Sequence, residues 1–315
     1  MKKSNILLII VIVLLLALIG YVVLSSADDR EVDDVNNPDL ILDTVDNDIN
    51  DRANVNDEND EDDDSNNRGD RSVIGTSVNG NDITAYHFGD GDEELLLVAG
   101  IHGGYSWNTS LLAYDLIDYL EDSEGELPDD LTVTVIPTLN PDGLQKVTGE
   151  IGIFQARDVN ANDSERSRAR FNANNVDLNR NFACDWQPEG IWAGTEVDAG
   201  SSAFSEPEAQ ALRGYINNNN VTEAIVYYAA AGGVYSSACG GSASAASNNL
   251  MNVYANASGY PAEGQFDAYE LSGDAVNWMA REGINGISVL LTNYSNPETA
   301  QNRAGLQAII DSLAN

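Results

Sequence analysis

The sequence predicts a mixed α/β domain over residues 71–315, with a mostly parallel central sheet flanked by helices. Three observations predict this fold class: apolar strand patterns, helical patterns that alternate with them, and turn signals between the two. Strands that are apolar along their whole length are typical of a sheet covered on both faces. Because ligands bind beyond the carboxyl ends of such strands, we expect the functional residues there.

The predicted elements run from a hairpin to a final helix. Residues 73–91 alternate in polarity around Asn79-Gly80, a strong signal for a tight turn between two strands. Continuous apolar runs predict strands that begin near residues 94, 131, 223 and 284. Helical patterns follow the turn at 101–109 and cover 206–216, 242–258, 272–283 and 296–314, with Ser205 as the expected N-cap of the 206–216 helix.

Residues 1–27 are predicted to be a transmembrane signal-anchor. Lys2 and Lys3 precede an apolar stretch of nineteen residues from Ile6 to Leu24, which as a helix spans about 28 Å, close to the thickness of a bilayer core. The two lysines favour a cytoplasmic N-terminus, so the rest of the chain is expected to be extracytoplasmic. Cleavage at Ser25-Ser26-Ala27 is the alternative, and the domain would then be secreted.

Residues 28–70 have the composition of an acidic disordered linker. They contain eighteen Asp and Glu residues against three Arg, and they cannot bury enough apolar surface to fold. The remaining domain, residues 71–315, contains 33 acidic and 10 basic residues, a net charge of about −23. No basic stripe is available to neutralise phosphates, so nucleic acid is excluded as a partner.

The chain contains two cysteines, Cys184 and Cys239. An even pair in an extracytoplasmic domain favours a disulfide over a metal site. A disulfide between them would tie two distant segments of the domain together.

The order of the motifs resembles that of the zinc carboxypeptidase family, of the carboxypeptidase A type. The histidine-containing turn "IHGGYSWNT" is followed by "NPDG" at 140–143, "VDLNRNF" at 176–182 and "FSEP" at 204–207, and "INGISVLLTN" completes the series. The resemblance covers roughly residues 72–314. It implies the family's fold, a zinc cofactor and a peptide substrate held by its C-terminal carboxylate.

The resemblance also implies a set of zinc-binding and catalytic positions, and most of them are substituted here. In the family, a His and a Glu of the first turn and a later His hold zinc, and a Glu on the last strand is the general base. His102 matches the first ligand. The expected Glu position is Ser106 or its neighbour Tyr105, and the remaining two positions fall at Ala229, with Ala230 as the alternative, and at Leu290.

Neither an alanine nor a leucine can bind a metal ion or accept a proton. No confident catalytic residue therefore remains, and zinc, expected from the family, is predicted to be lost or weakly bound, with His102 as a vestigial ligand. Asp177 matches the acid that orients this histidine in the family.

The residues that grip the substrate carboxylate are predicted to be kept. Asn179 and Arg180 match the family's carboxylate-binding pair, and Tyr269 aligns with its mobile tyrosine. Arg170 matches the further arginine, although Arg166 and Arg168 lie close by in the sequence. The planar guanidinium group suits a carboxylate in two-point contact. A purely structural role for this motif, with Arg180 paired to an internal acid, is the alternative.

These observations favour a membrane-anchored extracytoplasmic pseudo-peptidase that binds the C-termini of peptides or cell-wall peptides without cutting them. One alternative is an active zinc metallocarboxypeptidase with displaced ligands, for instance Asp177 or Glu270. Another is a structural or adhesive ectodomain with no ligand in the cleft.

Overall fold

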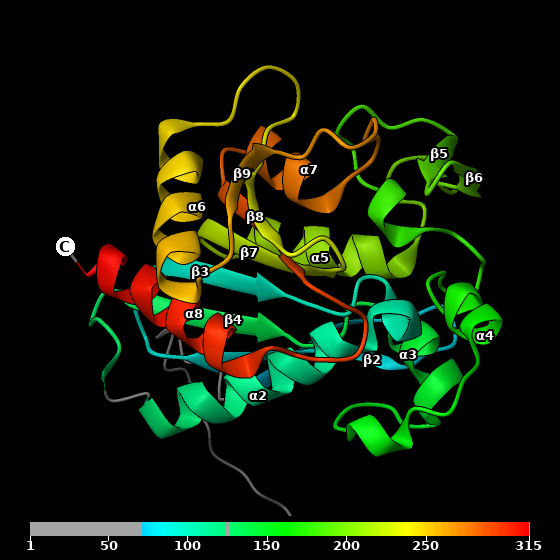
Figure 1. Cartoon of the computed structure of the whole chain (residues 1–315), viewed down its shortest axis with the longest axis horizontal. Helices are drawn as coiled ribbons and strands as arrows, with labels where there is room; N and C mark the ends of the chain where they lie inside the picture. Colours follow the sequence, from blue (N-terminus) through cyan, green and yellow to red (C-terminus); the bar gives the residue numbers. More distant parts are fainter. Residues whose placement is uncertain (1–70, 124–125, 315) are drawn as a thin grey trace, which may run out of the picture. The chain divides into compact units, whose positions relative to one another are not determined.

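The computed structural model describes residues 71–123 and 126–314, which form an eight-stranded mixed sheet with helices on both faces (Figure 1). The predicted signal-anchor at 1–27 and the acidic linker at 28–70 lie outside the described residues, so both stay predictions. In the described part of the chain, every helix is too short or too polar to cross a membrane. The strands are β1 (Arg71–Thr76), β2 (Asp82–Phe88), β3 (Glu93–Val98), β4 (Leu131–Ile136), β5 (Glu189–Trp192), β6 (Thr195–Asp198), β7 (Val221–Ala229), β8 (Gly233–Ser236), β9 (Ala262–Gln265) and β10 (Asn285–Leu291).

The helices lie between these strands, as the alternating sequence pattern predicts. The α-helices are α2 (Trp107–Ser123), α3 (Pro141–Thr148), α4 (Asp163–Arg168), α5 (Pro207–Asn218), α6 (Ala245–Ser258), α7 (Ala275–Arg281) and α8 (Thr299–Leu313). Short 3₁₀ turns are η1 (Gly103–Ser106), η3 (Ala156–Asp158) and η4 (Leu178–Arg180).

The central sheet has the order β1-β2-β4-β3-β7-β10-β8-β9. Its four middle strands, β4, β3, β7 and β10, are parallel, whereas β1, β2 and β8 pair antiparallel to their inner neighbours. The predicted mixed, mostly parallel sheet is therefore confirmed. The carboxyl ends of the four parallel strands meet along one edge, and the loops after them carry the predicted site.

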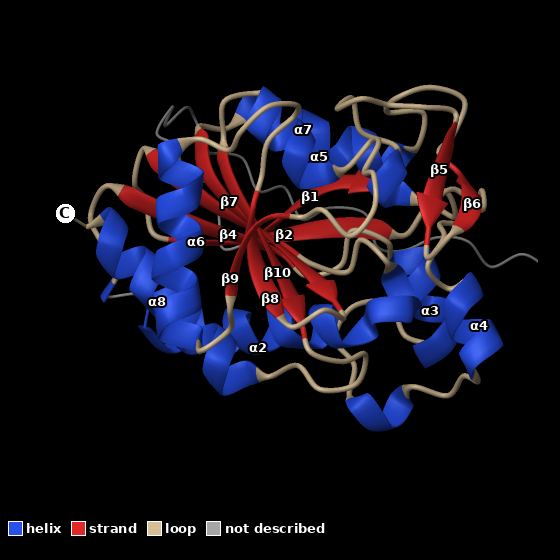
Figure 2. Cartoon of the chain, turned by 45° about the horizontal axis from the view of Figure 1, so that its top comes forward, coloured by secondary structure: helices blue, strands red, loops and turns tan. Residues whose placement is uncertain are grey.

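Two apolar layers cover the sheet. Helices α2, α6 and α8 pack on one face, where buried residues such as Leu116, Tyr254 and Leu306 join the side chains of β3, β4 and β7. Helices α5 and α7 pack on the other face, around residues such as Leu212 and Trp278. Figure 2 shows the helices on both sides of the twisted sheet. This double cover explains why the central strands are apolar along their whole length.

The start of α5 differs from the expectation that Ser205 caps it. The N-cap residue is Glu206, and no side-chain cap hydrogen bond is formed. Pro207 occupies the first turn, where the missing N–H costs no hydrogen bond. The Glu208 side chain instead accepts hydrogen bonds from the backbone N of Val78 and from Asn172, which link α5 to the first hairpin and to the segment after α4.

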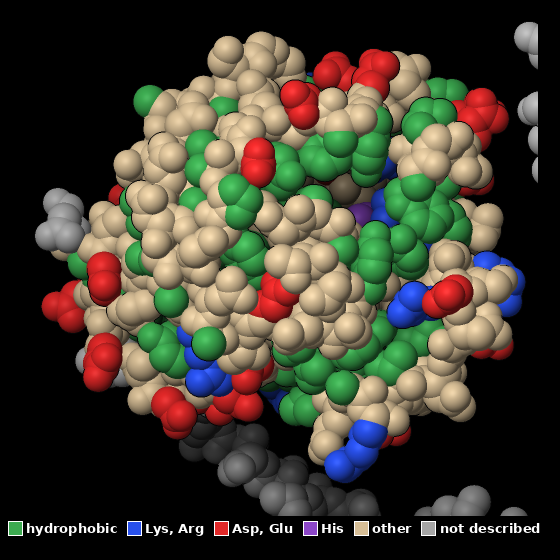
Figure 3. All heavy atoms as spheres, viewed as in Figure 1, with side chains coloured by type: hydrophobic (Ala, Val, Ile, Leu, Met, Phe, Trp, Pro, Cys, Tyr) green, Lys and Arg blue, Asp and Glu red, His purple; other side chains and the backbone are tan. Residues whose placement is uncertain are grey.

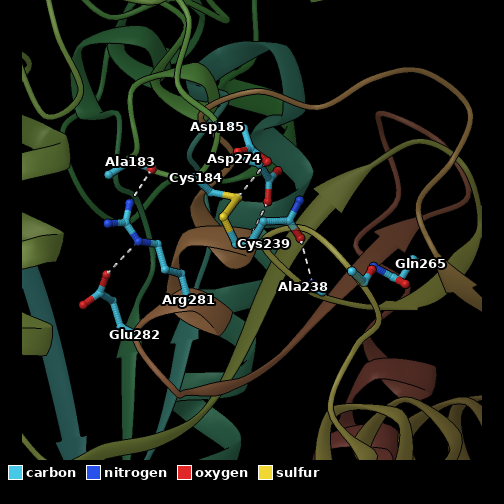
Figure 4. The surroundings of a disulfide bond; sticks show 11 residues. Ala183, Cys184, Asp185, Ala238, Cys239, Gln265, Asp274, Arg281 and Glu282 are labelled. Atoms are coloured by element: carbon cyan, nitrogen blue, oxygen red, sulfur yellow. Dashed lines mark hydrogen bonds and ion pairs between the residues drawn. A yellow bond between two sulfur atoms is a disulfide. The ribbon is translucent and has the colours of Figure 1, made fainter.

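The two cysteines lie 55 residues apart in the chain and are paired, with their Cα atoms 5.6 Å apart. Cys184 follows η4, and Cys239 lies in the loop between β8 and α6. The disulfide therefore links the segment after η4 to the loop between β8 and α6 (Figure 4).

Replacing Cys184 and Cys239 together by serine is expected to lower the free energy of unfolding by about 2–4 kcal/mol, because the 55-residue loop is then open in the unfolded state. Chemical denaturation of the double variant and the parent measures this difference. Thiol titration of the unfolded, unreduced parent should find no free thiol. Two free thiols in that titration would contradict the pairing.

Candidate functional site

A cleft of about 310 Å³ lies beyond the carboxyl ends of the parallel strands. Figure 3 shows a hollow on one face of the molecule, with histidine and basic side chains visible at its floor. The cleft brings together residues that are up to 192 positions apart: His102, Tyr105, Arg170, Asn179, Arg180, Trp192, Ala193, Tyr228, Ala229, Ala230, Ala231, Phe266, Ala268, Tyr269, Leu271, Asp274, Ser288, Leu290 and Tyr294.

His102 lies at the floor of the cleft, between β3 and η1. Its side chain is buried, and neither ring nitrogen has a hydrogen-bond partner among the described residues. The ring packs at a tilt against Tyr228, with 5.5 Å between ring centroids. Burial and the positive charges of Arg170 and Arg180 hold the pKa of His102 well below its usual value, so the imidazole is neutral at pH 7.

Asp177 forms no hydrogen bond with His102, in contrast to the orienting role that the family resemblance implies. Its Oδ2 accepts a hydrogen bond of 2.9 Å from Arg170 Nε, and its Oδ1 accepts one from the backbone N of Asn179. The reason is electrostatic: a buried carboxylate is stabilised more by a guanidinium ion than by a neutral imidazole. Burial opposes ionisation of Asp177, but the charges of Arg170 and Arg180 and the Arg170 hydrogen bond outweigh it and lower its pKa.

Ser106 and its neighbour Tyr105, the expected positions of the family's glutamate, differ in their surroundings. Tyr105 lines the cleft, whereas Ser106 is buried outside its lining and its hydroxyl has no partner among the described residues. The Tyr105 hydroxyl donates a hydrogen bond of 3.0 Å to Tyr294, and its ring packs edge-on against Trp192. An aromatic cluster therefore stands where the second metal ligand is expected.

Ala229 and Leu290 both line the cleft, at the ends of neighbouring strands. The register of β7 and β10 pairs Ala229 with Leu291 and Tyr228 with Leu290. Ala230 lines the cleft too, so the alternative position for the second histidine is equally apolar. The side chains at these strand ends provide neither a metal ligand nor a general base.

The residues around His102 do not fit a catalytic zinc ion. Such an ion needs three protein ligands and an open position. Within the described residues, the one group of three or more candidate ligands that lie close enough together is Cys184, Asp185 and Cys239, and His102 is not part of it. Both sulfur atoms of that group belong to the disulfide. Of the acids proposed as displaced ligands, Asp177 is paired with Arg170, and Glu270 lines a neighbouring cavity.

The two arginines of the cleft differ in how their charges are balanced. Arg170 forms a buried ion pair with Asp177 and lies over the Trp192 ring at 4.5 Å. Arg180 is 1% exposed and donates hydrogen bonds of 2.7 Å to the backbone carbonyls of Asn179 and Ile191. Its Nε has no partner, and no carboxylate lies within ion-pairing distance of it in the part of the chain that the structure describes.

Asn179 and Tyr269 flank Arg180. The Asn179 side-chain oxygen accepts hydrogen bonds from the Tyr228 hydroxyl and the backbone N of Ala275, and its nitrogen donates to Asp274 Oδ2 at 2.8 Å. These bonds fix the amide and leave one of its two N–H groups for a ligand. The Tyr269 ring is 37% exposed and lies 5.9 Å from the Arg180 guanidinium carbon, at the mouth of the cleft.

Three residues of the site were not predicted from the sequence. Trp192 comes from the β5–β6 hairpin, whose strands are four residues long and carry no clear alternation. Tyr228 ends β7 and covers His102, and Asp274 caps α7 and holds Asn179. The "GD" before the α7 pattern was the available signal for Asp274, because Asp is a favoured N-cap residue.

The chain is similar to a known protein family and to several solved structures. The family model described as zinc carboxypeptidase matches residues 64–298. No curated protein sequence matches the chain. Solved structures that resemble it include carboxypeptidase A from Helicoverpa armigera, with a TM-score of 0.63 and 17% identity over 78% of this chain and 68% of that one. They also include the murein-tripeptide amidase MpaA from Escherichia coli O157, with a TM-score of 0.53 and 20% identity over 78% of this chain and 92% of that one.

Proposed function

The chain belongs to the zinc carboxypeptidase family, and from the contents of its cleft we propose that the domain binds the C-terminal carboxylate of a peptide without hydrolysing it. The domain is held at the outer face of a membrane by residues 1–27 and extended from it by the acidic linker at 28–70. The C-termini of peptides, cell-wall peptides among them, are its ligands.

One observation carries this proposal: the Arg180 guanidinium is buried beside the cleft with no acidic partner at ion-pairing distance among the described residues. A buried charge is costly unless it is paired and hydrogen-bonded. Two of its five N–H groups are bound to carbonyls, and Nε is unpartnered. A ligand carboxylate would supply the missing negative charge and accept bidentate hydrogen bonds. The alternative, in which Arg180 pairs with an internal acid, has no support in the contacts of this arginine.

The substituted centre supports binding without hydrolysis. Within the described residues, no cluster of three candidate metal ligands includes the His102 imidazole, and the strand ends beside it carry Ala229 and Leu290. At the expected ligand and base positions, the side chains of Ala229 and Leu290 can neither hold a metal-bound water nor accept a proton from an attacking water. The proposal therefore keeps the family's carboxylate-binding residues, whereas the family's zinc-binding and general-base positions carry other residues.

A comparison of peptide acids with peptide amides tests the proposal. N-acetylated tripeptides with a free C-terminal carboxylate are expected to bind at least tenfold more tightly than the same peptides with a C-terminal amide, because the amide has no charge to offer Arg180. Isothermal titration calorimetry at fixed ionic strength measures both.

Three outcomes, from these titrations or from a zinc titration, would contradict the proposal. Equal affinities for acid and amide, or no binding of either, would favour a structural or adhesive ectodomain. Stoichiometric, tight zinc binding accompanied by release of the C-terminal residue would favour an active enzyme with displaced ligands.

A further inference from the structure

Two cysteines and an aspartate form a group of metal-ligating side chains outside the cleft. The ligand atoms of Cys184, Asp185 and Cys239, two sulfurs and a carboxylate oxygen, all lie within 4.8 Å of one another. None of the three residues lines the cleft of His102 and Arg180. Cys184 and Asp185 follow η4, whereas Cys239 lies in the loop between β8 and α6. The group is therefore a candidate site that the proposed function does not use.

The Asp185 carboxylate lies close to the sulfur atoms. Asp185 has a φ of +48°, in the left-handed region that aspartate visits more readily than most residues with a β-carbon. Its Oδ2 lies 3.9 Å from Cys184 Sγ, and Figure 4 shows the side chain beside the disulfide. Within residues 71–123 and 126–314, the carboxylate forms no ion pair. It is therefore available to a cation.

A cavity of about 350 Å³ gives a cation access to this group. Cys184 and Asp185 line the cavity, together with the exposed acids Asp267 and Glu270. The residues that line it include no lysine, arginine or histidine. Exposed acids are common on so acidic a domain and by themselves indicate no ligand. They give the cavity a negative potential, which raises the local concentration of cations beside the two sulfurs.

The geometry of the group is close to that of a zinc site. Zinc is bound by thiolates at about 2.3 Å and by carboxylate oxygens at about 2.0–2.2 Å, so neighbouring ligand atoms of a tetrahedral site are roughly 3.3–3.8 Å apart. The distance of 3.9 Å between Asp185 Oδ2 and Cys184 Sγ is near this range. The Cα atoms of Cys184 and Cys239 are 5.6 Å apart. Rotation about the Cα–Cβ bonds would therefore bring two unbonded thiolates to one ion.

We propose that Cys184, Asp185 and Cys239 bind a soft divalent cation such as Zn²⁺ whenever the two cysteines are thiols, before the disulfide forms or after it is reduced. The fourth position of the ion faces the cavity. On binding, two S–H bonds break, two sulfur–metal bonds form and two protons are released, without transfer of electrons. The disulfide excludes the ion, because the thiolate is the form of cysteine that binds metals.

The ion would replace the disulfide as a cross-link between the same two segments. The backbone N of Gly273 donates a hydrogen bond to the carbonyl of Cys184, and the backbone N of Phe182 donates to the carbonyl of Gly273. The next residue, Asp274, accepts a hydrogen bond from Asn179. A cross-link at Cys184 therefore stabilises a segment that continues to the cleft. Because the ion binds the folded thiol form, it must stabilise that form.

Thermal unfolding of the full chain tests the inference in four samples, oxidised and reduced, each with and without Zn²⁺. Tris(2-carboxyethyl)phosphine opens the disulfide: the phosphine takes the oxygen atom of one water, and the two sulfurs take its protons. At a zinc concentration about 100 times the dissociation constant, the midpoint of the reduced form is expected to rise by about 5 °C or more. The midpoint of the oxidised form should not change. With Co²⁺ in place of Zn²⁺, only the reduced form should show thiolate-to-metal charge-transfer absorption.

Three variants locate the ion. Asp185→Asn should weaken zinc binding to the reduced form at least tenfold in calorimetric titrations, and Cys184→Ser should abolish the charge-transfer absorption. Asp267→Asn is the matched control, because it removes another exposed acid of the same cavity that lies outside the group, and it should bind zinc as the parent does. If Cys184→Ser does not fold, Asp185→Asn and Asp267→Asn provide the comparison.

Several outcomes would overturn the inference. They are the absence of zinc binding in the reduced form, equal binding in the oxidised and reduced forms, and equal weakening by Asp185→Asn and Asp267→Asn. The inference goes beyond the proposed function and is tested without a peptide. Failure of the zinc site therefore leaves the comparison of peptide acids and amides unaffected, and equal affinities in that comparison leave the zinc site unaffected. Zinc bound at these cysteines is expected to release no C-terminal residue from a peptide.

Discussion

Replacing Arg180 by alanine is expected to weaken the binding of a free peptide carboxylate by about 2–5 kcal/mol, or roughly 30-fold to several thousand-fold in the dissociation constant. The magnitude follows from burial. The guanidinium is 1% exposed, so water screens its interaction with a ligand little, and its loss leaves the carboxylate in the cleft without a counter-ion. Calorimetric titration with one peptide acid measures the change, and the amide of the same peptide should show almost none.

Two further variants show whether the effect belongs to the guanidinium group. Arg180→Lys keeps the charge but loses the planar fork and should recover only part of the affinity. Arg303→Ala removes an arginine that pairs with Asp115 between α8 and α2, away from the cleft, and should bind the peptide as the parent does. Unchanged affinity in a folded Arg180→Ala protein would refute the proposal that Arg180 binds the peptide carboxylate.

Replacing Asp177 by asparagine is expected to lower the free energy of unfolding by about 3–5 kcal/mol at pH 7. The ion pair with Arg170 is almost fully buried, with side-chain exposures of 0% for Asp177 and 3% for Arg170. Asparagine keeps the shape but leaves the Arg170 charge uncompensated. Urea or guanidinium denaturation measures the loss. Asp163→Asn, which breaks the exposed pair between Asp163 and Arg166, should cost less than about 1 kcal/mol.

The Asp177 prediction also has a pH dependence with a definite sign. The pKa of Asp177 is lower in the folded protein than its ordinary value of 3.8. Its ionised form therefore stabilises the fold fully above pH 3.8 and loses this effect as the pH falls through the lower, folded-state pKa. The difference in unfolding free energy between parent and Asp177→Asn should be constant near neutral pH and shrink below pH 4. An equal difference at pH 7 and at strongly acidic pH would contradict the assigned pair.

The fold was predictable because several local signals agree. Asn79-Gly80 marks the first hairpin, and the apolar run that contains Leu95 and Leu97 is a central strand, as its burial on both faces requires. The positions of His102 and Leu290 followed from motif order and from their places beyond or at the end of a predicted strand, and that of Arg180 followed from the "VDLNRNF" motif. Sequence patterns and topology together therefore located the cleft.

The contacts inside the cleft were less predictable, because they depend on neighbours that are distant in the sequence. Tyr105 and Ser106 are adjacent in one 3₁₀ turn, and only the packing of Tyr294 and Trp192 decides which of them lines the cleft. Asp177 was expected beside His102, but Arg170 binds it instead. Ser236 and Asp274 line one cavity although they come from separate elements, and the sequence around neither residue predicts that cavity.

At Gly190 in β5, glycine is the only kind of residue that leaves room for the Arg180 side chain in its present position, and this requirement can be checked in other sequences. A β-carbon at this position would lie 2.6 Å from Cδ and 2.7 Å from Cγ of Arg180, atoms too close to the backbone to move aside. Any larger residue would therefore push the guanidinium group out of place. In homologous chains, a glycine ten positions after this arginine would identify those in which the strand closes over the arginine in the same way, and a larger residue there would identify those in which it does not.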